Sequence, residues 1–133
     1  MSDCLFCKII NGELPSHKIY EDEYTYAFLD ISNDCKGHTL VIPKKHVENI
    51  FDCDNDTLSH TIKTVKKISN HYKLLGYDGV NILNANDKSA QQSIFHLHFH
   101  ILPRKISDNI NAWPELKKLN LDLKSVCEEL KLN

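Results

Sequence analysis

The sequence predicts an α+β fold: an antiparallel five-stranded sheet with one main helix, a short N-terminal helix and a C-terminal helix. Short runs rich in aromatic and β-branched residues follow one another along the chain, and one long segment has the periodicity of an amphipathic helix. Strands that come in succession, with few helices between them, are typical of antiparallel sheets. The 133 residues are expected to form a single domain over 1–133.

The first part of the chain predicts a short helix followed by a hairpin. Apolar residues at helical spacing precede Gly12, which favours a helix near residues 4–11. Lys18–Tyr20 and Tyr24–Leu29 are rich in aromatic and β-branched residues and flank a polar turn. This pattern predicts two paired strands.

The middle of the chain predicts a third strand and the main helix. The strand is expected at His38–Ile42, where Pro43 closes it. Apolar residues then recur every three or four positions over 58–75, and Gly76 is the expected helix stop. The lysines on the opposite face of this helix predict a solvated surface rather than a nucleic-acid-binding patch.

The last elements are two strands and a C-terminal helix. Val80–Leu83 predicts a fourth strand, and the polar segment 84–92 predicts a loop. Phe95–Leu102 predicts a fifth strand that ends at Pro103. Apolar residues at helical spacing over 123–130 predict a helix packed on the domain.

Composition narrows the classes of function. The formal net charge of -2 gives no global attraction to nucleic acid or to membranes, and no segment approaches the about 18 apolar residues of a membrane span. The N-terminus is too short and interrupted for a signal peptide. The five cysteines are an odd number, so an even disulfide framework would leave one cysteine free. We therefore expect a reduced, cytoplasmic protein.

Three histidines alternate with apolar residues near the end of the fifth predicted strand. Side chains on a strand alternate between its two faces. The residues of one face are Phe95, Leu97, Phe99 and Ile101, and those of the other are His96, His98 and His100. Three histidines on one face are compatible with solvent exposure, with a metal site that uses two of them, or with a site for phosphate or another anion.

Several stretches resemble one protein family. HLHFHIL has the His-x-His-x-His pattern of the histidine-triad (HIT) superfamily, and its flanks agree: LDIS (29–32), GHTLVIPKKHVENI (37–50) and QSIFHLHFHILPR (92–104). These motifs are similar to the nucleotide-binding, purine phosphoramidase branch. The resemblance is strongest over 4–104, which leaves 105–133 as a C-terminal extension. It implies the HIT-like fold.

The resemblance implies a role for each histidine of a catalytic site. His98 matches the family nucleophile, which would attack an α-phosphorus and form a nucleotidyl-histidine that water then hydrolyses. His100 and Ser93 match residues beside the phosphate, and His38 matches a fourth histidine of the site. The implied activity is that of a hydrolase that cleaves a nucleoside 5'-phosphoramidate or a related bond and releases the nucleoside monophosphate.

The resemblance also implies the nucleotide-binding residues. Asp30 would accept hydrogen bonds from the ribose hydroxyls of a purine nucleotide. The other implied nucleotide-binding residues are Leu5, Phe6, Ile9, Phe28, Ile31, Leu40, Asn84, Gln92, Ser93, His98 and His100. Taken singly, each apolar member of this set is equally compatible with an ordinary core position.

A second, structural site is implied by the same resemblance. Cys4-x-x-Cys7 alone is a weak signal, compatible with redox chemistry or with chance. In many bacterial members of the family, two such cysteines and two histidines, here His46 and His96, hold zinc. Cys₂His₂ is a ligand set of closed tetrahedral zinc sites. The expected cofactor is therefore a structural Zn²⁺, without an organic cofactor.

The chain departs from the family pattern in one loop. The family usually has asparagine at position 85 and glycine at 87 and 91, where this chain has Ala85, Asp87 and Gln91. Glycine adopts backbone conformations that other residues resist, so these positions bear on rate and leaving-group preference. Trp113–Pro114 resembles a feature that some relatives place near the partner subunit's site, and the resemblance implies a homodimer.

Two other functions remain open from the sequence. A dinucleoside polyphosphate hydrolase would use the same chemistry with a larger leaving group. A nucleotide-binding regulatory module would have little turnover. The intact His98 favours an enzyme, and the altered loop favours the module.

Overall fold

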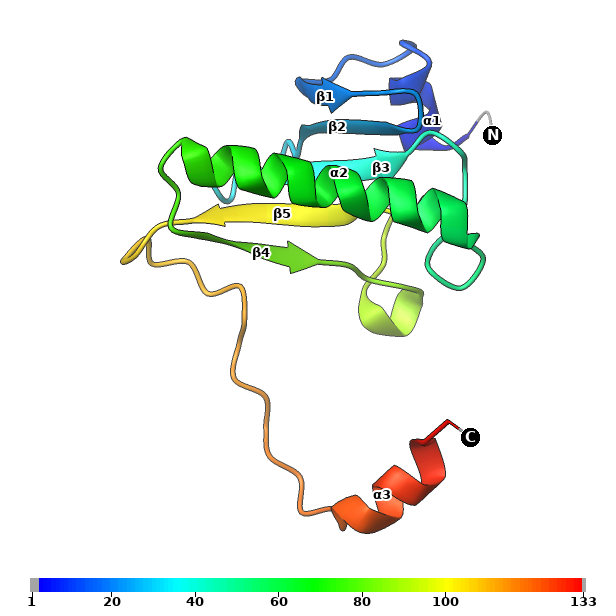
Figure 1. Cartoon of the computed structure of the whole chain (residues 1–133), viewed down its shortest axis with the longest axis vertical. Coiled ribbons are helices and arrows are strands. Elements are labelled where there is room, and N and C mark those ends of the chain that lie inside the picture. Colours follow the sequence, from blue (N-terminus) through cyan, green and yellow to red (C-terminus); the bar gives the residue numbers. More distant parts are fainter. Residues whose placement is uncertain (1–2, 133) are drawn as a thin grey trace.

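The computed structural model describes residues 3–132 and has a five-stranded antiparallel sheet with strand order β1-β2-β3-β5-β4 (Figure 1). The elements are α1 (Leu5–Ile10), β1 (Lys18–Glu21), β2 (Thr25–Leu29), β3 (Thr39–Pro43), α2 (Asn55–Leu74), β4 (Gly79–Leu83), the 3₁₀ turn η1 (Lys88–Ala90), β5 (Phe99–Arg104) and α3 (Leu123–Leu130). The predicted α+β class, the five strands and the three helices are confirmed. Within the described residues, no helix is both long and apolar enough to cross a membrane.

Each face of the sheet packs against one helix. Val65, Ile68 and Tyr72 of α2 belong to a buried cluster with strand residues such as Val41 and Ile101. On the other face, the short helix α1 packs against β2 and β3, in a second buried cluster that contains Phe6, Ile9, Phe28, Leu40 and Ile42. The two helices therefore lie on opposite faces of the sheet, each with its apolar side against the strands. The histidine row lies on the α1 face.

Helix α2 begins a few residues earlier than the apolar spacing predicts. The Asp54 carboxylate caps it by accepting a hydrogen bond from the Thr57 N–H at 3.0 Å. Such a cap satisfies one of the N–H groups that have no partner within the helix. The helix stops where the sequence predicts, because Gly76 takes a φ of 106° that disfavours other residues.

Strand β5 differs from its prediction at both ends. It begins at Phe99 rather than Phe95, because the preceding segment leaves the ladder and the Leu97 N–H donates to the Val47 carbonyl at 2.8 Å. Pro103 lies inside the strand, opposite Val80. The pairing of β5 with β3 ends at Ile101, so the missing N–H of Pro103 removes no bond from that ladder.

Pro43, the other proline that is predicted to close a strand, also lies within its strand rather than after it. Strand β3 begins at Thr39 and its last residue is Pro43, which pairs with Thr25. The ladder tolerates Pro43 at the strand end, where it contributes a carbonyl group. Despite these shifts, side chains alternate between the two faces as predicted: Leu97 and Ile101 are both buried in the core on the α2 side.

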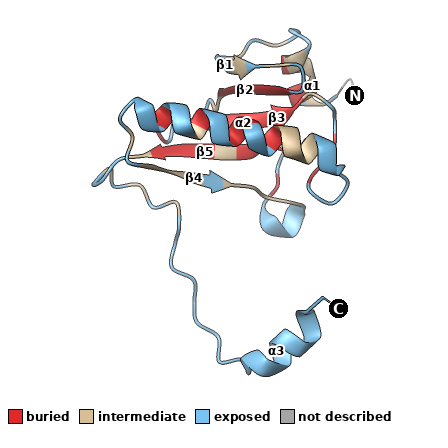
Figure 2. Ribbon diagram, viewed as in Figure 1, coloured by how far each residue is buried: buried red, intermediate tan, exposed pale blue. Residues whose placement is uncertain are grey.

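The C-terminal extension contains the predicted helix, but the prediction that this helix packs on the domain is wrong. Residues 113–122 run away from the sheet and α3 lies at their far end (Figure 1). None of its residues is buried (Figure 2), and Leu123 is 77% exposed. The amphipathic pattern predicts a helix but does not identify the surface that covers it.

In the loop before β5, two residues that are not glycine have backbone angles that favour glycine. Asp87 has φ 76° and ψ 171°, and Gln91 has φ 71° and ψ 29°. The first combination is populated almost entirely by glycine, and a residue with a Cβ held there costs about 1–3 kcal/mol. The Asp87 side chain offsets part of this cost by accepting a hydrogen bond from the Lys88 N–H at 2.8 Å.

This strain predicts the effect of restoring glycine. We expect Asp87→Gly to be more stable than Asp87→Ala by about 1–3 kcal/mol, because both variants lose the side-chain hydrogen bond and only glycine removes the Cβ. Urea unfolding of the two variants measures the difference directly. Equal midpoints at equal slopes would show that the backbone at position 87 is not strained.

Candidate active site and metal cluster

The ring of His98 is held in one orientation by the main chain. Its Nδ1–H donates to the His96 carbonyl oxygen at 2.7 Å, which leaves Nε2 with a free lone pair. The edge of the Phe6 ring packs against the His98 ring with 5.2 Å between centroids. Burial lowers the pKa of His98 below its ordinary value, so the neutral ring predominates near pH 7. A neutral, oriented imidazole is suited to act as a nucleophile.

A second hydrogen-bonded chain runs through His100 and His38. His38 Nδ1 lies 2.7 Å from an Asp34 carboxylate oxygen, and His38 Nε2 lies 2.8 Å from His100 Nδ1. The carboxylate can only accept, so His38 donates from Nδ1 and accepts at Nε2 from the His100 N–H. Burial lowers the pKa of His100 to about 4. Sequence reasoning missed Asp34, because its spacing of four residues from His38 lies in a turn and not in a helix.

Most of the predicted nucleotide-binding residues line one cavity. It has a volume of about 380 Å³ and lies between α1 and the α1 face of the sheet. The predicted residues in its lining are Leu5, Phe6, Ile9, Phe28, Asp30, Ile31, Leu40, Ser93, His98 and His100. Apolar walls that converge on a few polar groups are typical of ligand sites. Because the resemblance implies that a nucleotide binds to these residues, we refer to this cavity as the nucleotide slot.

Asp30 has a fixed position at the edge of the nucleotide slot. Its main-chain N–H donates to the His38 carbonyl at 2.8 Å, and its carboxylate accepts from the Ser32 N–H at 2.9 Å. One carboxylate oxygen also lies 3.6 Å from His38 Nε2. Asp30 therefore offers acceptor oxygens to a bound molecule on a backbone that the sheet holds in place.

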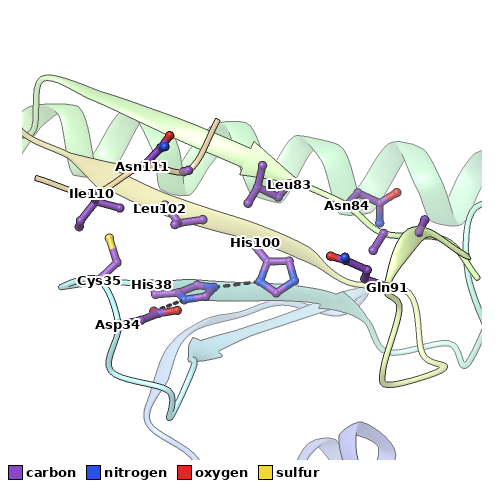
Figure 3. Close-up of a pocket in the computed structure, with 13 residues that line it drawn as sticks. Asp34, Cys35, His38, Leu83, Asn84, Gln91, His100, Leu102, Ile110 and Asn111 are labelled. Carbon is purple, nitrogen blue, oxygen red and sulfur yellow. Dashed lines mark hydrogen bonds and ion pairs between the residues drawn. The ribbon is translucent and has the colours of Figure 1, made fainter. Parts of the chain in front are cut away.

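A second cavity lies beside the first, and His100 lines both. Its volume is about 490 Å³, and Figure 3 shows its lining residues around His38 and His100. Asn84 lines this second cavity rather than the nucleotide slot, and its side-chain N–H donates to the His98 carbonyl at 2.9 Å. Ala85 and Gln91, two of the departures from the family pattern, also line it.

Gln92 lies in neither cavity, contrary to its predicted place among the nucleotide-binding residues. It is buried, and its amide nitrogen donates to the carbonyl groups of Glu48 and Ile94 at 2.7 and 3.0 Å. Its amide oxygen accepts from the Asp87 N–H at 2.7 Å. The hydrogen bonds of Gln92 are used to hold the loop, which gives this side chain a structural role.

The four predicted metal ligands lie together at the start of α1. The ligand atoms of Cys4, Cys7, His46 and His96 all lie within 4.8 Å of one another. Cys4 Sγ and His96 Nδ1 are 3.4 Å apart, Cys7 Sγ and His46 Nδ1 are 3.4 Å apart, and the two Nδ1 atoms are 3.1 Å apart. A tetrahedral zinc ion places its ligand atoms roughly 3.3–3.8 Å apart. The four side chains therefore fit such an ion.

The protonation of His96 also suits a metal ligand. Its Nε2 lies 2.8 Å from the Pro43 carbonyl oxygen, which can only accept, so this nitrogen carries the proton. Nδ1 is then unprotonated and faces the two sulfur atoms. A metal-binding histidine usually donates a hydrogen bond from the ring nitrogen that does not bind the metal, and this bond fixes its tautomer.

Fold and site together define a class of protein: an α+β domain with an oriented row of histidines between two cavities, and a separate Cys₂His₂ cluster. A family model described as the HIT domain matches residues 11–106. The chain belongs to this family, and relatives with assigned activities place it among HIT-family hydrolases.

Relatives extend over nearly the whole chain. An uncharacterized HIT-like protein of Methanocaldococcus jannaschii is 50% identical over 129 residues, which cover 96% of this chain and 98% of the relative. An adenosine 5'-monophosphoramidase of Saccharomyces cerevisiae is 40% identical over 113 residues, which cover 84% of this chain and 70% of the yeast protein.

Solved structures agree with the fold. The crystal structure of a Streptococcus mutans protein superposes with a TM-score of 0.86 at 42% identity, covering 97% of this chain and 82% of that one. A zinc-bound histidine triad family protein of Mycobacterium smegmatis superposes with a TM-score of 0.80 at 35% identity, covering 87% of this chain and 85% of that one.

Proposed function

We propose that the chain hydrolyses a nucleoside 5'-phosphoramidate, or a related bond at an α-phosphorus, and releases the nucleoside monophosphate. The observation that carries this proposal is the orientation of His98. Its Nδ1–H is fixed by the His96 carbonyl, and its ring lines the cavity that Asp30 also lines. A base and ribose in the nucleotide slot would place an α-phosphorus beside the free Nε2.

The proposed reaction has two steps at phosphorus. In the first, a bond forms between His98 Nε2 and phosphorus while the phosphorus–nitrogen bond breaks, and the departing nitrogen takes a proton from solvent. In the second, the oxygen of a water molecule bonds to phosphorus while the bond to His98 Nε2 breaks, and the water gives a proton back to solvent, so that the monophosphate is released and His98 is regenerated. Ser93 lies in the same cavity and would donate to a phosphate oxygen, as would His100 once its Nε2 carries a proton, while Asp30 would accept from ribose hydroxyls.

The relatives support the hydrolase over the binding module. The yeast relative is named as an adenosine 5'-monophosphoramidase, which is the activity proposed for this chain. The altered loop leaves the nucleophile in place, because Ala85 and Gln91 line the neighbouring cavity and Asn84 still holds the His98 carbonyl. We therefore expect full turnover rather than nucleotide binding alone.

The role of His98 predicts a large and specific loss of activity. We expect His98→Ala to reduce the turnover of adenosine 5'-phosphoramidate by more than the roughly 10²–10⁴-fold typical of losing a general acid or base, because the covalent route disappears. His98→Asn should be equally inactive while keeping a similar volume. Both variants should still bind AMP, since Asp30, Ser93 and His100 remain.

Trapping the intermediate distinguishes His98 from its neighbours. Rapid quench of the wild-type protein with the same substrate should leave acid-labile AMP on a peptide that spans 95–104, and fragmentation should place it on His98. Turnover of His98→Ala at the wild-type rate, or an adduct on His96 or His100, would refute this assignment.

We further propose that the Cys₂His₂ cluster holds a structural zinc ion. The fit of the four ligand atoms supports it, and so does the relative from Mycobacterium smegmatis that is described as zinc-bound. Zinc at this position would tie α1, which carries Cys7, to the segment before β5, which carries His96. It would thereby stabilise the wall of the nucleotide slot that Leu5, Phe6 and Ile9 supply.

Metal removal tests this second proposal. Protein purified without chelator should contain about one zinc per chain, and Cys4→Ser should lose it. The melting temperature should fall by several degrees, because each 1 kcal/mol of lost stability corresponds to about 2–8 °C for domains of this size range. Cys127→Ser is the matched control, since Cys127 is exposed and distant in sequence from the cluster. Wild-type protein without metal would overturn the proposal.

We also propose a homodimer that forms along β4. This strand lies at an edge of the sheet, and edge strands present unpaired main-chain groups. Its Ile82 side chain is 45% exposed, so the edge also presents apolar surface. A second copy would cover Ile82 and pair the edge.

A substitution at the edge tests the dimer. Sedimentation should give twice the chain mass of 15.3 kDa, and Ile82→Asp should weaken self-association about tenfold or more by placing a charge in an apolar contact. Ile19→Asp is the control, because Ile19 lies on β1 at the opposite edge and is 39% exposed. A monomeric wild type at micromolar concentration, or equal effects of the two variants, would contradict an interface at β4.

A further inference from the structure

The cavity beyond His100 is the larger of the two beside the histidine row, at about 490 Å³. Its walls are mostly apolar and include Leu83, Leu102 and Ile110, and the amides of Asn84 and Gln91 lie at one end (Figure 3). None of these residues lines the nucleotide slot. The cavity is therefore a second compartment that shares the His100 ring with the first.

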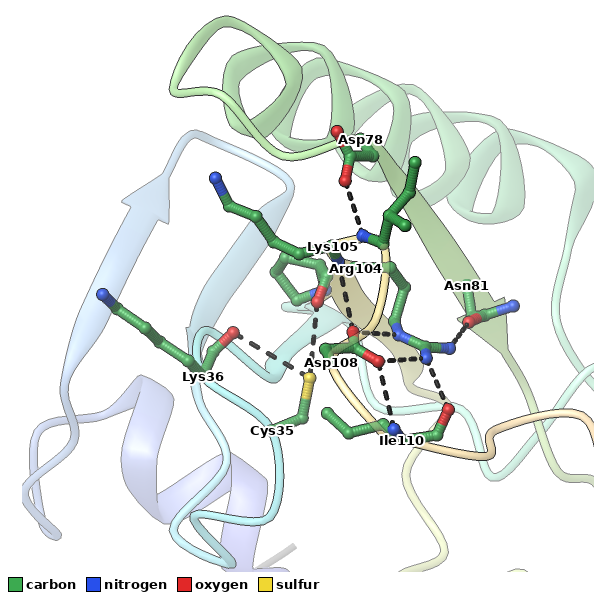
Figure 4. Close-up of polar contacts among 10 residues, drawn as sticks. Cys35, Lys36, Asp78, Asn81, Arg104, Lys105, Asp108 and Ile110 are labelled. Carbon is green, nitrogen blue, oxygen red and sulfur yellow. Dashed lines mark hydrogen bonds and ion pairs between the residues drawn. The ribbon is translucent and has the colours of Figure 1, made fainter.

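One wall of this cavity comes from the C-terminal extension and is fixed by an ion pair. Arg104 Nε and Nη2 donate to the two carboxylate oxygens of Asp108 at 2.8 and 2.7 Å, and Nη2 also donates to the Ile110 carbonyl (Figure 4). The Asn81 side chain accepts from the third nitrogen of the guanidinium at 2.7 Å. A bidentate arginine–carboxylate pair has a defined geometry, so Ile110 is positioned rather than loosely placed.

Asp34 is the one residue with a fixed charge among the described residues that line this cavity. Its carboxylate accepts the 2.7 Å hydrogen bond from His38, which is the main cause that holds the pKa of Asp34 below its usual value. Asp34 is therefore negatively charged at neutral pH. Its side chain is 58% exposed, so solvent and salt attenuate its field.

The direction of the reaction assigns the two cavities to different parts of the substrate. Displacement at phosphorus places the attacking and leaving atoms on opposite sides of the phosphorus. His98 lines the nucleotide slot and not the second cavity, whereas His100 lines both. A phosphoryl group held between His98 and His100 would direct its leaving group away from His98 and into the second cavity.

We propose that the second cavity binds the leaving group of the substrate, and that Asp34 makes it select neutral or cationic amines over anionic groups. This inference rests on the proposed hydrolase function and specifies its substrate class. A polyphosphate or carboxylate leaving group would bring negative charge towards Asp34, with no lysine or arginine in the described lining to balance it. A protonated amine on a short alkyl chain would instead approach the carboxylate across the apolar wall.

Three matched substrates test the inference. Adenosine 5'-phosphoramidates with N-(3-aminopropyl), N-propyl and N-(2-carboxyethyl) groups are compared by kcat/KM. For wild type we expect the ratio of the cationic to the anionic substrate to exceed that of Asp34→Asn by about three- to tenfold, the scale of an exposed charge contact that changes sign. The N-propyl substrate carries no charged group, so the change in its kcat/KM measures any general effect of the substitution on His38. This general effect cancels in the ratio of the cationic to the anionic substrate.

Two controls separate charge selection from a structural effect. Asp56→Asn makes the same change of net charge in the first turn of α2, away from the cavity, and should leave the ratio unchanged. In wild type the ratio should fall as salt rises, because an exposed charge is screened within a Debye length of about 10 Å at 0.1 M. The rate of hydrolysis of the nucleotidyl-histidine should be equal for all three substrates, since the leaving group has already departed.

The outcomes distinguish this inference from the proposed function. Turnover of all three substrates with the same ratio in wild type and Asp34→Asn, and no dependence of that ratio on salt, overturns the role of Asp34 and leaves the hydrolase intact. Absence of turnover for every substrate by a protein that binds AMP overturns the hydrolase, and the inference falls with it. A ratio that shifts in Asp34→Asn but not in Asp56→Asn supports the inference.

Discussion

The hydrogen bond from the His98 ring to the His96 carbonyl joins the two parts of the site. His96 contributes its main chain to this bond and its ring to the Cys₂His₂ cluster, where Nε2 is also held by the Pro43 carbonyl. A displacement of His96 would therefore move the candidate nucleophile and the cluster together. The segment before β5 leaves the sheet ladder, so the orientation of His98 depends on such contacts rather than on strand pairing.

Contacts at both ends of α1 explain why so short a helix can form one wall of a binding cavity. A helix of six residues has little stability of its own in water. Phe6 and Ile9 bury its apolar side against β2 and β3, while Cys4 and Cys7 bring its first turn to His96 and His46. The wall of the nucleotide slot is thus fixed from both ends, by apolar burial and by the proposed metal site. Apolar residues that taken singly are compatible with an ordinary core position, such as Phe28 and Leu40, therefore line a cavity here.

Local patterns were sufficient to predict most of the fold, and they failed where distant segments decide the outcome. Alternation correctly placed Leu97 and Ile101 in the core, but it extended β5 back to Phe95 because it could not register the bond between Leu97 and Val47. The sequence predicts that a strand ends at Pro103, but Pro103 lies within β5 because the pairing of β5 with β3 ends at Ile101. The resemblance groups residues that line one cavity, and it also includes Gln92, which lies outside that cavity with its hydrogen-bond partners in two loops. Asp34 escaped notice because its role depends on a turn that brings it back to His38.

The C-terminal extension has two parts with different physical requirements. Up to Ala112 it is held by the Arg104–Asp108 pair and forms a wall of the second cavity, so its position follows from contacts within the chain. Beyond that point large apolar side chains remain in solvent, with Trp113 80% and Leu130 70% exposed. Exposed apolar surface of this extent favours association, and the proposed dimer supplies a second copy on which it could be buried. The two parts of the extension therefore depend on different contacts. The wall at Ile110 is held by Arg104 within the chain, whereas α3 would be covered only by a surface that the proposed dimer supplies.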